Sequence, residues 1–427
     1  MSKIKMFALV AISILSLSLY ANPDEICNIK AIEYFEEVKV LCAQDSCKTW
    51  GIELYGPILF VDMNTREIVA NVQDANGQLK KVGNVYTGIY PNSLPIANTA
   101  VEWNGTRWTM VIWQALGGRK LERNNLIIHE LWHRIQEDIG FKFTPSNNSH
   151  LNELDGRLLL KMEWLALAKA IETNGNQQLH HMQSALQFRQ HRRALFAGSD
   201  TTEVLFEMHE GLATHTGFRL CGASDIEMKK MLLSKVNKSV KQHTLLLSFA
   251  YTSGVLYGYL LDQSGRDWRK DLTQKDDFGR LLIEAYDLKL SNGDINLENL
   301  YSEYDTDNLM ADEQEYEIEM QAFLKLCEQR FLGKSNLIIP MSMCQISFNP
   351  HDVVPFGIFG TVYKTFNAFG EWGKLETNRG ALVAPDWSKV IIDAPDDDLS
   401  SLNWSISLNA GWGLIQKSDG HYYVMKL

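Results

Sequence analysis

The stretch NNLIIHELWHRIQ, residues 124–136, places two histidines four positions apart, at His129 and His133, with Glu130 between them. Residues four apart lie on the same face of an α-helix, one turn from each other. The apolar residues of the stretch fall on the opposite flank and predict contact with a core; they are Ile127, Ile128, Leu131 and Ile135. A core helix that carries an imidazole pair on its remaining side is typical of a metal site.

The pattern H-E-x-x-H on a helix also indicates a chemistry. Two imidazole nitrogens can bind zinc, which lowers the pKa of a bound water. The glutamate then accepts the proton of that water as it attacks a carbonyl. The alternative is a chance match on an amphipathic helix. Because the motif follows a predicted β-hairpin able to line a cleft, we expect His129 and His133 to bind Zn²⁺ and Glu130 to be the general base.

A catalytic zinc needs a third protein ligand and an open position for water. No H-x-x-G-x-x-H continuation follows His133 in the sequence, so the candidates are downstream glutamates. The stretch MHEGLATHTG contains Glu210, and the stretch HLNELDG contains Glu153.

An H-E-x-x-H motif followed by a ligand glutamate resembles the gluzincin metallopeptidases, which include thermolysin and the aminopeptidase N family. In many of them the glutamate lies in the pattern N-E-G-x-A-x-Y. The resemblance places Glu210 in the ligand position and Gly211 where a small residue lets two helices approach closely. This chain departs from the pattern in two ways. His215 replaces the tyrosine of the pattern, and the gap from His133 to Glu210 is far longer than in thermolysin, so the helices between them would be an insertion.

Glu153 is the rival third ligand. Its spacing from His133 is that of the thermolysin glutamate, and Asn152 precedes it as in that enzyme. Its surroundings lack the E-G-x-A pattern, and an acidic residue near a helix N-terminus has an ordinary role there. The local pattern favours Glu210, whereas the spacing favours Glu153.

The resemblance implies further site residues. In aminopeptidase N relatives a Y-x-x-G segment supplies a tyrosine to the tetrahedral oxyanion, and Tyr251 with Gly254 matches this segment. Packing in an apolar helix is the alternative for Tyr251, and Tyr257 or Tyr259 could serve instead. In the same family an upstream edge-strand glutamate binds the substrate amine. Glu102 in TAVEW stands at a comparable distance, although an exposed strand residue is the favoured interpretation.

Other polar residues of the helical region have more ordinary interpretations. Glu203 and Glu207 share the predicted helix face of Glu210. One of them is a candidate to hydrogen-bond the free nitrogen of a ligand histidine, and a solvated acidic face is the alternative. The histidines of one downstream helix are interpreted as surface residues rather than a second metal site: His180, His181 and His191.

The pattern of apolar residues predicts an α+β fold. From about Gly56 to Trp113, short β-rich runs alternate with turns, and Asn104-Gly105 gives the type I′ signal of a hairpin. Residues 124–334 are mostly helical by apolar spacing. Residues 335–427 read as short strands broken by Gly, Pro and Asn, which predict a small all-β domain. By the resemblance, residues 22–123 and 124–334 make a zincin-like catalytic region, a β-rich part followed by a helical zinc-binding domain.

Residues 1–21 have the form of a secretory signal peptide. Lys3 and Lys5 precede the apolar run MFALVAISILSLSLY, and Ala21 offers a small residue for cleavage. Leu19 is a poor match to a cleavage site, so an N-terminal membrane anchor is the alternative. We expect cleavage and export to a periplasmic or extracellular location, with no membrane span afterwards.

The composition limits the class of protein and its partners. The chain has 427 residues, 45% of them hydrophobic and 22% charged, which is enough for two or three globular domains. Of its 41 basic residues, 39 follow the signal and face 52 acidic ones, a balance that disfavours nucleic-acid binding. All six cysteines follow the signal, and Cys42 with Cys47 is the favoured disulfide in an oxidising compartment.

Together these features predict an exported zinc metallopeptidase of the gluzincin type that acts on a peptide or protein substrate. Two alternatives stay open. One is a non-catalytic periplasmic or surface protein of zincin-like fold that binds a peptide or partner, and the other is a zinc hydrolase of non-peptide amides or esters. Endopeptidase or aminopeptidase action, the oligomeric state and the role of the C-terminal β domain are left open by the sequence.

Overall fold

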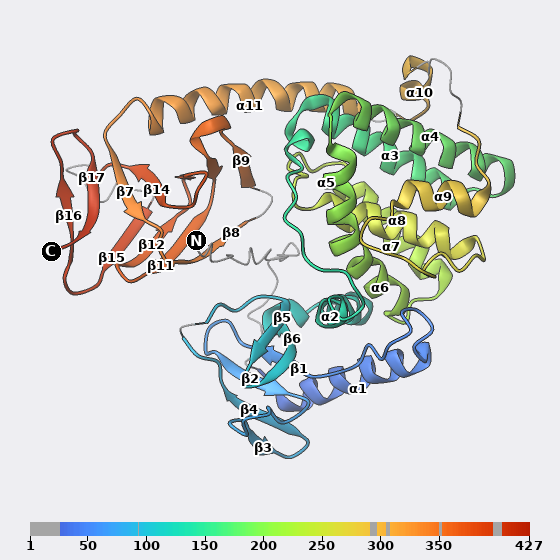
Figure 1. The fold of residues 1–427 in the computed structure, drawn as a ribbon, viewed down its shortest axis with the longest axis horizontal. Helices are drawn as coiled ribbons and strands as arrows, with labels where there is room; N and C mark the ends of the chain where they lie inside the picture. The colour runs from blue at the N-terminus through green and yellow to red at the C-terminus, as the bar shows by residue number, and fades with distance from the viewer. Residues whose placement is uncertain (1–25, 93, 291–296, 305–307, 350–351, 396–403) are drawn as a thin grey trace, which may run out of the picture. The chain divides into compact units, whose positions relative to one another are not determined.

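The computed structural model describes residues 26–92, 94–290, 297–304, 308–349, 352–395 and 404–427 (Figure 1). The predicted signal peptide lies outside them. The chain divides into two compact units: unit 1 comprises the described residues of 1–148, 159–241 and 249–304, and unit 2 comprises 149–158, 242–248 and the described residues of 305–427. The predicted α+β class is confirmed. Among the described residues, no helix combines the length and apolar character that a membrane crossing requires.

A six-stranded sheet forms the N-terminal part of unit 1, in the order β3-β4-β2-β1-β6-β5. Its strands are β1 (Ile58–Val61), β2 (Glu67–Ala70), β3 (Lys80–Val82), β4 (Val85–Ile89), β5 (Thr99–Trp103) and β6 (Thr106–Ile112). β1 and β6 are parallel, and the other neighbours are antiparallel. The predicted hairpin joins β5 to β6: Asn104 and Gly105 have φ of 49° and 72°, the positive values that a type I′ turn needs.

The sheet packs against a helix that the sequence analysis did not predict, α1 (Asn28–Asp45). The ring of Phe35 on α1 stacks on Phe60 of β1 with 4.5 Å between centroids. Alternate residues of β1 and β6 point to the opposite face and join a second apolar cluster, because successive strand side chains alternate; they are Leu59, Val61, Trp108 and Met110. The predicted β-rich segment 22–123 therefore includes a helix before its strands.

The rest of unit 1 is helical, as predicted. β6 leads through the 3-10 turn η1 (Trp113–Leu116) into α2 (Lys120–Ile135), which contains the H-E-x-x-H stretch. The predicted core residues of α2 are at most 1% exposed: Ile127, Ile128, Leu131 and Ile135. The helices that follow are α3 (Leu154–Glu172), α4 (Gly175–Leu195), α5 (Ser199–Phe206), α6 (Leu212–Leu220), α7 (Asp225–Ser239), α8 (Phe249–Gln263), α9 (Phe278–Tyr286) and α10 (Leu297–Tyr304).

α5 continues into α6 through a π-helical turn, η3 (Glu207–Gly211). The wider turn adds about one residue, so the residues after it are rotated by about 100° relative to a continuous α-helix. Such turns are rare and are often found at functional sites. This one contains Glu210.

Unit 2 contains the short 3-10 helix η2 (Ser149–Asn152), α11 (Leu309–Phe331) and the C-terminal strands. One sheet has the order β16-β17-β7-β14-β13-β10-β9 and the other the order β15-β12-β11-β8. The strands are β7 (Asn336–Pro340), β8 (Gln345–Phe348), β9 (Val353–Pro355), β10 (Thr361–Tyr363), β11 (Phe366–Gly370), β12 (Gly373–Thr377), β13 (Ala381–Val383), β14 (Lys389–Asp393), β15 (Trp404–Leu408), β16 (Trp412–Gln416) and β17 (Tyr422–Lys426).

The two C-terminal sheets share one apolar core, to which Leu337 of β7 and Phe366 of β11 both belong. α11 packs on the other face of the larger sheet, where Phe331 contacts the cluster of Val362 and Leu382. The all-β character predicted for residues 335–427 is confirmed. By its contacts α11 belongs to this unit, so the compact body begins before the predicted boundary at residue 335.

Candidate metal centre

Two segments far apart in the sequence bring the candidate ligands together. α2 contributes His129 and His133, and η3 contributes Glu210. α6 packs along α2, and η3 packs against α8. A Cβ built on Gly254 of α8 would lie 2.3 Å from Cα of Gly211, so the two backbones approach too closely for a side chain on Gly254. The close approach predicted at Gly211 is confirmed.

The three ligand atoms converge on one point. Oε2 of Glu210 lies 3.5 Å from Nε2 of His129 and 3.4 Å from Nε2 of His133, and the two Nε2 atoms are 3.0 Å apart. The three side chains are at most 11% exposed. Burial raises the pKa of Glu210, but His133 and His129 outweigh it and hold that pKa well below the ordinary value.

Hydrogen bonds to Nδ1 of His129 and of His133 fix the orientation of both imidazole rings. The Thr214 hydroxyl donates to the Glu210 carbonyl oxygen at 2.7 Å, so its oxygen is available to accept from Nδ1 of His129 at 3.3 Å. Nδ1 of His133 lies 3.1 Å from Oε1 of Gln136, an acceptor. With a metal ion bound, these contacts would hold the proton of each ring on Nδ1 and leave the Nε2 lone pairs to face the ion beside Glu210.

This arrangement fits a divalent cation. Two lone pairs and a carboxylate oxygen at these separations repel one another unless a positive charge lies among them, and Oε2 of Glu210 has no hydrogen-bond partner among the described residues. Ligands of a tetrahedral zinc with bonds of about 2.0–2.1 Å stand about 3.3 Å apart. The measured separations of 3.0, 3.4 and 3.5 Å agree with that value.

Glu130 lies beside these ligands as an unpaired buried carboxylate. It is 1% exposed, and neither oxygen has a hydrogen-bond partner among the described residues. Its Oε1 is 4.0 Å from Nε2 of His129. Burial raises the pKa of Glu130 to about 8, although His133 partly offsets this effect. A buried carboxylate without a partner costs several kcal/mol, which marks it as a candidate functional group.

Tyr251 on α8 also lies at the centre. Its ring stacks on that of His129, with 5.7 Å between centroids, and its hydroxyl is close enough to the Glu210 carboxylate for that charge to act on it. Burial, then the charge of Glu210, raise the pKa of Tyr251 well above the ordinary value, so the hydroxyl keeps its proton. The other two tyrosines are engaged elsewhere: Tyr257 donates to Glu163 at 2.8 Å and Tyr259 to Asp225 at 2.6 Å.

The solvated acidic face predicted for Glu203 and Glu207 is wrong. Both are 0% exposed, so they do not form a solvated face; Glu207 accepts from Arg189 and Glu203 accepts from Arg192. Glu210 does not share their helix face, because the π-helical turn rotates it away from Glu203 and Glu207.

The arginine partners form a buried charge network behind the metal centre. Arg189 and Arg192 of α4 bind carboxylates from α3 and from the α5–η3 segment. Asp277, the N-cap of α9, joins through Arg189 and Arg193. The network fixes the first residue of η3, because Oε1 of Glu207 accepts from Arg189 at 2.9 Å.

Among the described residues, the other predicted ones are not members of the convergent group. Glu153 is exposed and belongs to unit 2, whereas the convergent ligands lie in unit 1. Glu102 is on the edge strand β5 with 67% of its side chain exposed, and it lies 3.9 Å from Arg107 in the paired position of β6. His215 lies 3.4 Å from Asp262, away from the ligands.

A second convergent group occurs on unit 1, at His180, His181 and Glu303. Nε2 of His180 lies 3.0 Å from the Glu303 carboxylate, and Nδ1 of His181 lies 2.7 Å from the Tyr304 hydroxyl. The group is largely exposed, and these ring nitrogens already have hydrogen-bond partners. This agrees with the interpretation of the two histidines as surface residues.

The predicted disulfide is wrong. All six cysteines lie in the described part of the chain, and each is a free thiol. Cys42 is buried on α1, whereas Cys47 is exposed beyond the end of that helix. Burial raises the pKa of the Cys42 thiol to about 12.

The sequence analysis missed several polar residues around the centre. Thr214 and Gln136 orient the imidazoles, and helical spacing from Glu210 and His133 was the available signal for them. His209 packs its ring 5.2 Å from that of His133, and its Nδ1 is buried without a hydrogen-bond partner among the described residues. Burial lowers the pKa of His209 to about 4.

Comparison of the chain with protein-family models, curated proteins and solved structures found no match.

Proposed function

We propose that this protein is an exported zinc-dependent metallopeptidase of the gluzincin type. The observation that carries the proposal is the convergence of His129, His133 and Glu210 beside the unpaired carboxylate of Glu130. The three ligands would hold Zn²⁺, which supplies a Lewis acid that polarises a carbonyl and lowers the pKa of water.

The remaining residues have distinct roles in the proposed reaction. Glu130 would take the proton of the attacking water and later give it to the leaving amine. Tyr251 donates its hydroxyl to the developing oxyanion, a contact worth about 3 kcal/mol in comparable sites. Thr214 and Gln136 keep both ligand rings in the binding tautomer.

A peptide substrate is supported by the edge strand β5. α2 packs against β5 and β6, so the free edge of the sheet lies next to the helix that carries His129 (Figure 1). An extended peptide can add to such an edge through backbone hydrogen bonds. We expect the substrate to lie along β5 with one peptide bond at the metal centre.

The test is the substitution Glu130→Gln in the exported protein. It removes the base and keeps the side-chain size, so we expect zinc content of one ion per chain and a loss of peptide hydrolysis of at least about 1000-fold. Metal analysis and cleavage of a fluorogenic peptide library measure the two effects. Undiminished turnover in Glu130→Gln would remove its role as base, and a wild-type protein that binds no zinc would contradict the proposal as a whole.

A further inference from the structure

Helix α7 and the residue pair after it concentrate positive charge in an acidic chain. The chain has 52 acidic and 41 basic residues, yet no acidic residue occurs between Glu227 and Asp262. Five lysines lie in the first half of that interval: Lys229, Lys230, Lys235, Lys238 and Lys241. A lysine-rich helix face is usually a solvated surface, so burial and location decide whether it has a function.

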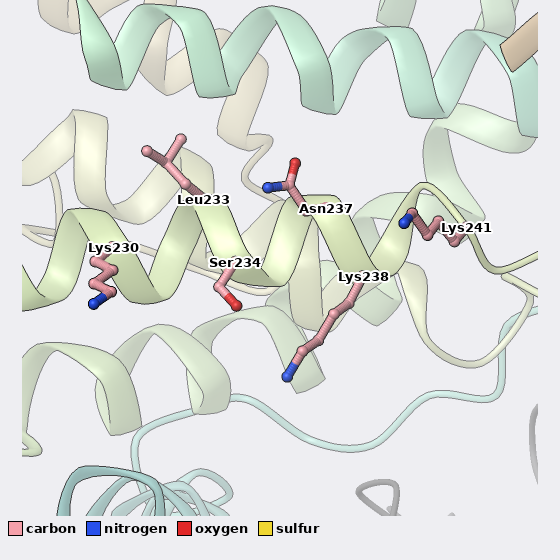
Figure 2. Close-up of a pocket in the computed structure, with 6 residues that line it drawn as sticks. All are labelled: Lys230, Leu233, Ser234, Asn237, Lys238 and Lys241. Atoms are coloured by element: carbon pink, nitrogen blue, oxygen red, sulfur yellow. The ribbon is translucent and has the colours of Figure 1, made fainter. Parts of the chain in front are cut away.

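Three of these lysines line an open groove of about 580 Å³ along α7 (Figure 2). They are Lys230, Lys238 and Lys241, and Leu233, Ser234 and Asn237 complete the lining. In Figure 2, Lys230, Ser234 and Lys238 project from one side of the helix, and Leu233 and Asn237 from the other. No carboxylate in the described part of the chain forms an ion pair with these three ammonium groups. We call them, together with Lys235, the α7 lysine cluster.

Lys235 is the most enclosed member of the cluster. Burial lowers its pKa to about 8, and the nearby charge of Lys238 lowers the pKa as well. No described acidic residue pairs with Lys235. An enclosed ammonium group beside a like charge is unfavourable, and a bound anion would relieve both costs.

The inner end of the cluster is fixed next to the metal centre. The Ser239 and Thr252 hydroxyls are 2.8 Å apart and tie α7 to α8. Thr252 follows Tyr251, whose ring stacks on His129. Lys235 lies one helical turn before Ser239, and its charge is among the smaller causes, after burial, that lower the pKa of His129.

The distance sets which part of a substrate can reach Lys235. Lys235 stands one helical turn, about 5.4 Å along the axis, from the Ser239–Thr252 link, and an extended chain advances about 3.3 Å per residue. A group within about three residues of the peptide bond at the metal centre can therefore reach the lysine cluster.

We propose that the α7 lysine cluster binds a carboxylate of the peptide substrate, with Lys235 as its innermost contact. This inference rests on the proposed function, because it assigns a substrate class to the same site. The carboxylate has two possible sources, the free C-terminus of a short peptide or an Asp or Glu side chain. In both, a negative charge is held within about three residues of the bond that is cleaved.

Binding to zinc-loaded Glu130→Gln protein tests the proposal without hydrolysis. The probes are four acetylated heptapeptides that carry Glu or Gln near the C-terminus, each with a free or an amidated C-terminus. Isothermal titration calorimetry should show binding about tenfold tighter for at least one charged form than for the neutral peptide. The Glu/Gln pair and the acid/amide pair distinguish the two sources.

Variants of α7 in the same background locate the effect. Lys235→Gln should abolish the charge preference, and Lys235→Glu should reverse it in favour of a peptide with Lys in place of Glu. Lys229→Gln is the matched control, because Lys229 lies on the same helix and pairs with Asp225 at 3.5 Å. Thermal unfolding of each variant checks that the fold is retained.

Three results would overturn the inference: equal affinity for charged and neutral peptides, an equal effect of Lys229→Gln and Lys235→Gln, or a cluster that binds anionic vesicles while peptide preference is unchanged in Lys235→Gln. Failure of the proposed function looks different. In that case wild-type protein hydrolyses no peptide, while the selective binding to Glu130→Gln protein and its loss in Lys235→Gln still support the lysine cluster.

Discussion

At the scale of single residues, Glu210 and Glu153 show how local sequence and burial decide between two candidate ligands. Glu210 lies 3.4 Å from Nε2 of His133 and is 6% exposed in its side chain. Glu153 has the spacing of thermolysin but is exposed and lies in unit 2. Spacing in the sequence failed here because α3, α4 and α5 lie between the two motifs, and the fold brings η3 back to α2.

Metal analysis of two alanine variants tests this assignment. We expect Glu210→Ala to bind zinc at least about 100-fold more weakly, since it removes one of three protein ligands. Glu153→Ala is the matched control and should retain one zinc per chain. Loss of zinc from Glu153→Ala alone would contradict the ligand set.

The convergence of His129, His133 and Glu210 beside Glu130 was predictable from the sequence, because the patterns H-E-x-x-H and H-E-G-x-A each indicate a local helix geometry. The orientation of the imidazoles by Thr214 and Gln136 was not, since Thr and Gln are common on helices. Helix α1 was missed although Ala31, Phe35, Val38 and Cys42 have helical spacing and are buried. This helical spacing was overlooked because α1 lies between the apolar signal segment and the first strands.

At the scale of elements, the contact of η3 with α8 positions both Glu210 and Tyr251. The sequence suggested the glycine of each motif separately, and the structure shows that Gly211 and Gly254 form one contact. A methyl group on Gly254 would overlap the Gly211 backbone and push η3 away from α8.

We therefore expect Gly254→Ala to lower the free energy of unfolding by about 2–3 kcal/mol and to weaken zinc binding more than tenfold. Denaturant unfolding and zinc titration measure the two effects. Gln263→Ala, at the exposed end of the same helix, should change neither. Wild-type zinc affinity in Gly254→Ala would show that this contact does not position the ligand.

The buried charge network makes a second prediction at this scale. Burial raises the pKa of Asp277, but Arg189 and Arg193 outweigh burial and hold that pKa well below its ordinary value. A carboxyl group whose pKa is lower in the folded state stabilises the fold above its ordinary pKa of about 3.9 and loses that contribution as the pH falls.

Asp277→Asn keeps the N-cap, because Asn caps helices about as well as Asp. It should destabilise the protein by about 2 kcal/mol at pH 7, and its difference from wild type should shrink as the pH is lowered below about 4. Urea unfolding at pH 7 and pH 3 measures this difference. Asp287→Asn at the exposed end of α9 is the control. A difference that does not depend on pH would exclude charge as its source.

At the scale of the whole molecule, all three candidate ligands lie in unit 1, while unit 2 has its own core between two sheets. The short strands broken by Gly, Pro and Asn after residue 334 correctly predicted an all-β region there. The sequence could not predict that α11 belongs to unit 2, since the apolar spacing of a helix does not show which domain it packs against. Its partners, Val362 and Leu382, come later in the chain.

Zinc should therefore stabilise one unit and not the other. We expect two transitions in calorimetry, of which a chelator lowers only one by several degrees, because zinc at about 1000 times its dissociation constant adds about 4 kcal/mol to the unit that binds it. In Glu210→Ala, the transition of unit 1 should stay at the lower temperature whether or not chelator is present. Equal shifts of both transitions would contradict the separation.

The π-helical turn has a consequence for how sequences of this kind tolerate length changes. Deletion of one residue between Glu207 and Glu210 would restore the regular i to i−4 pattern and turn everything downstream by about 100°. The carboxylate that faces the histidines would then turn toward the arginine-binding side. A related chain that lacks this one residue can keep the H-E-x-x-H helix intact and still have no third ligand.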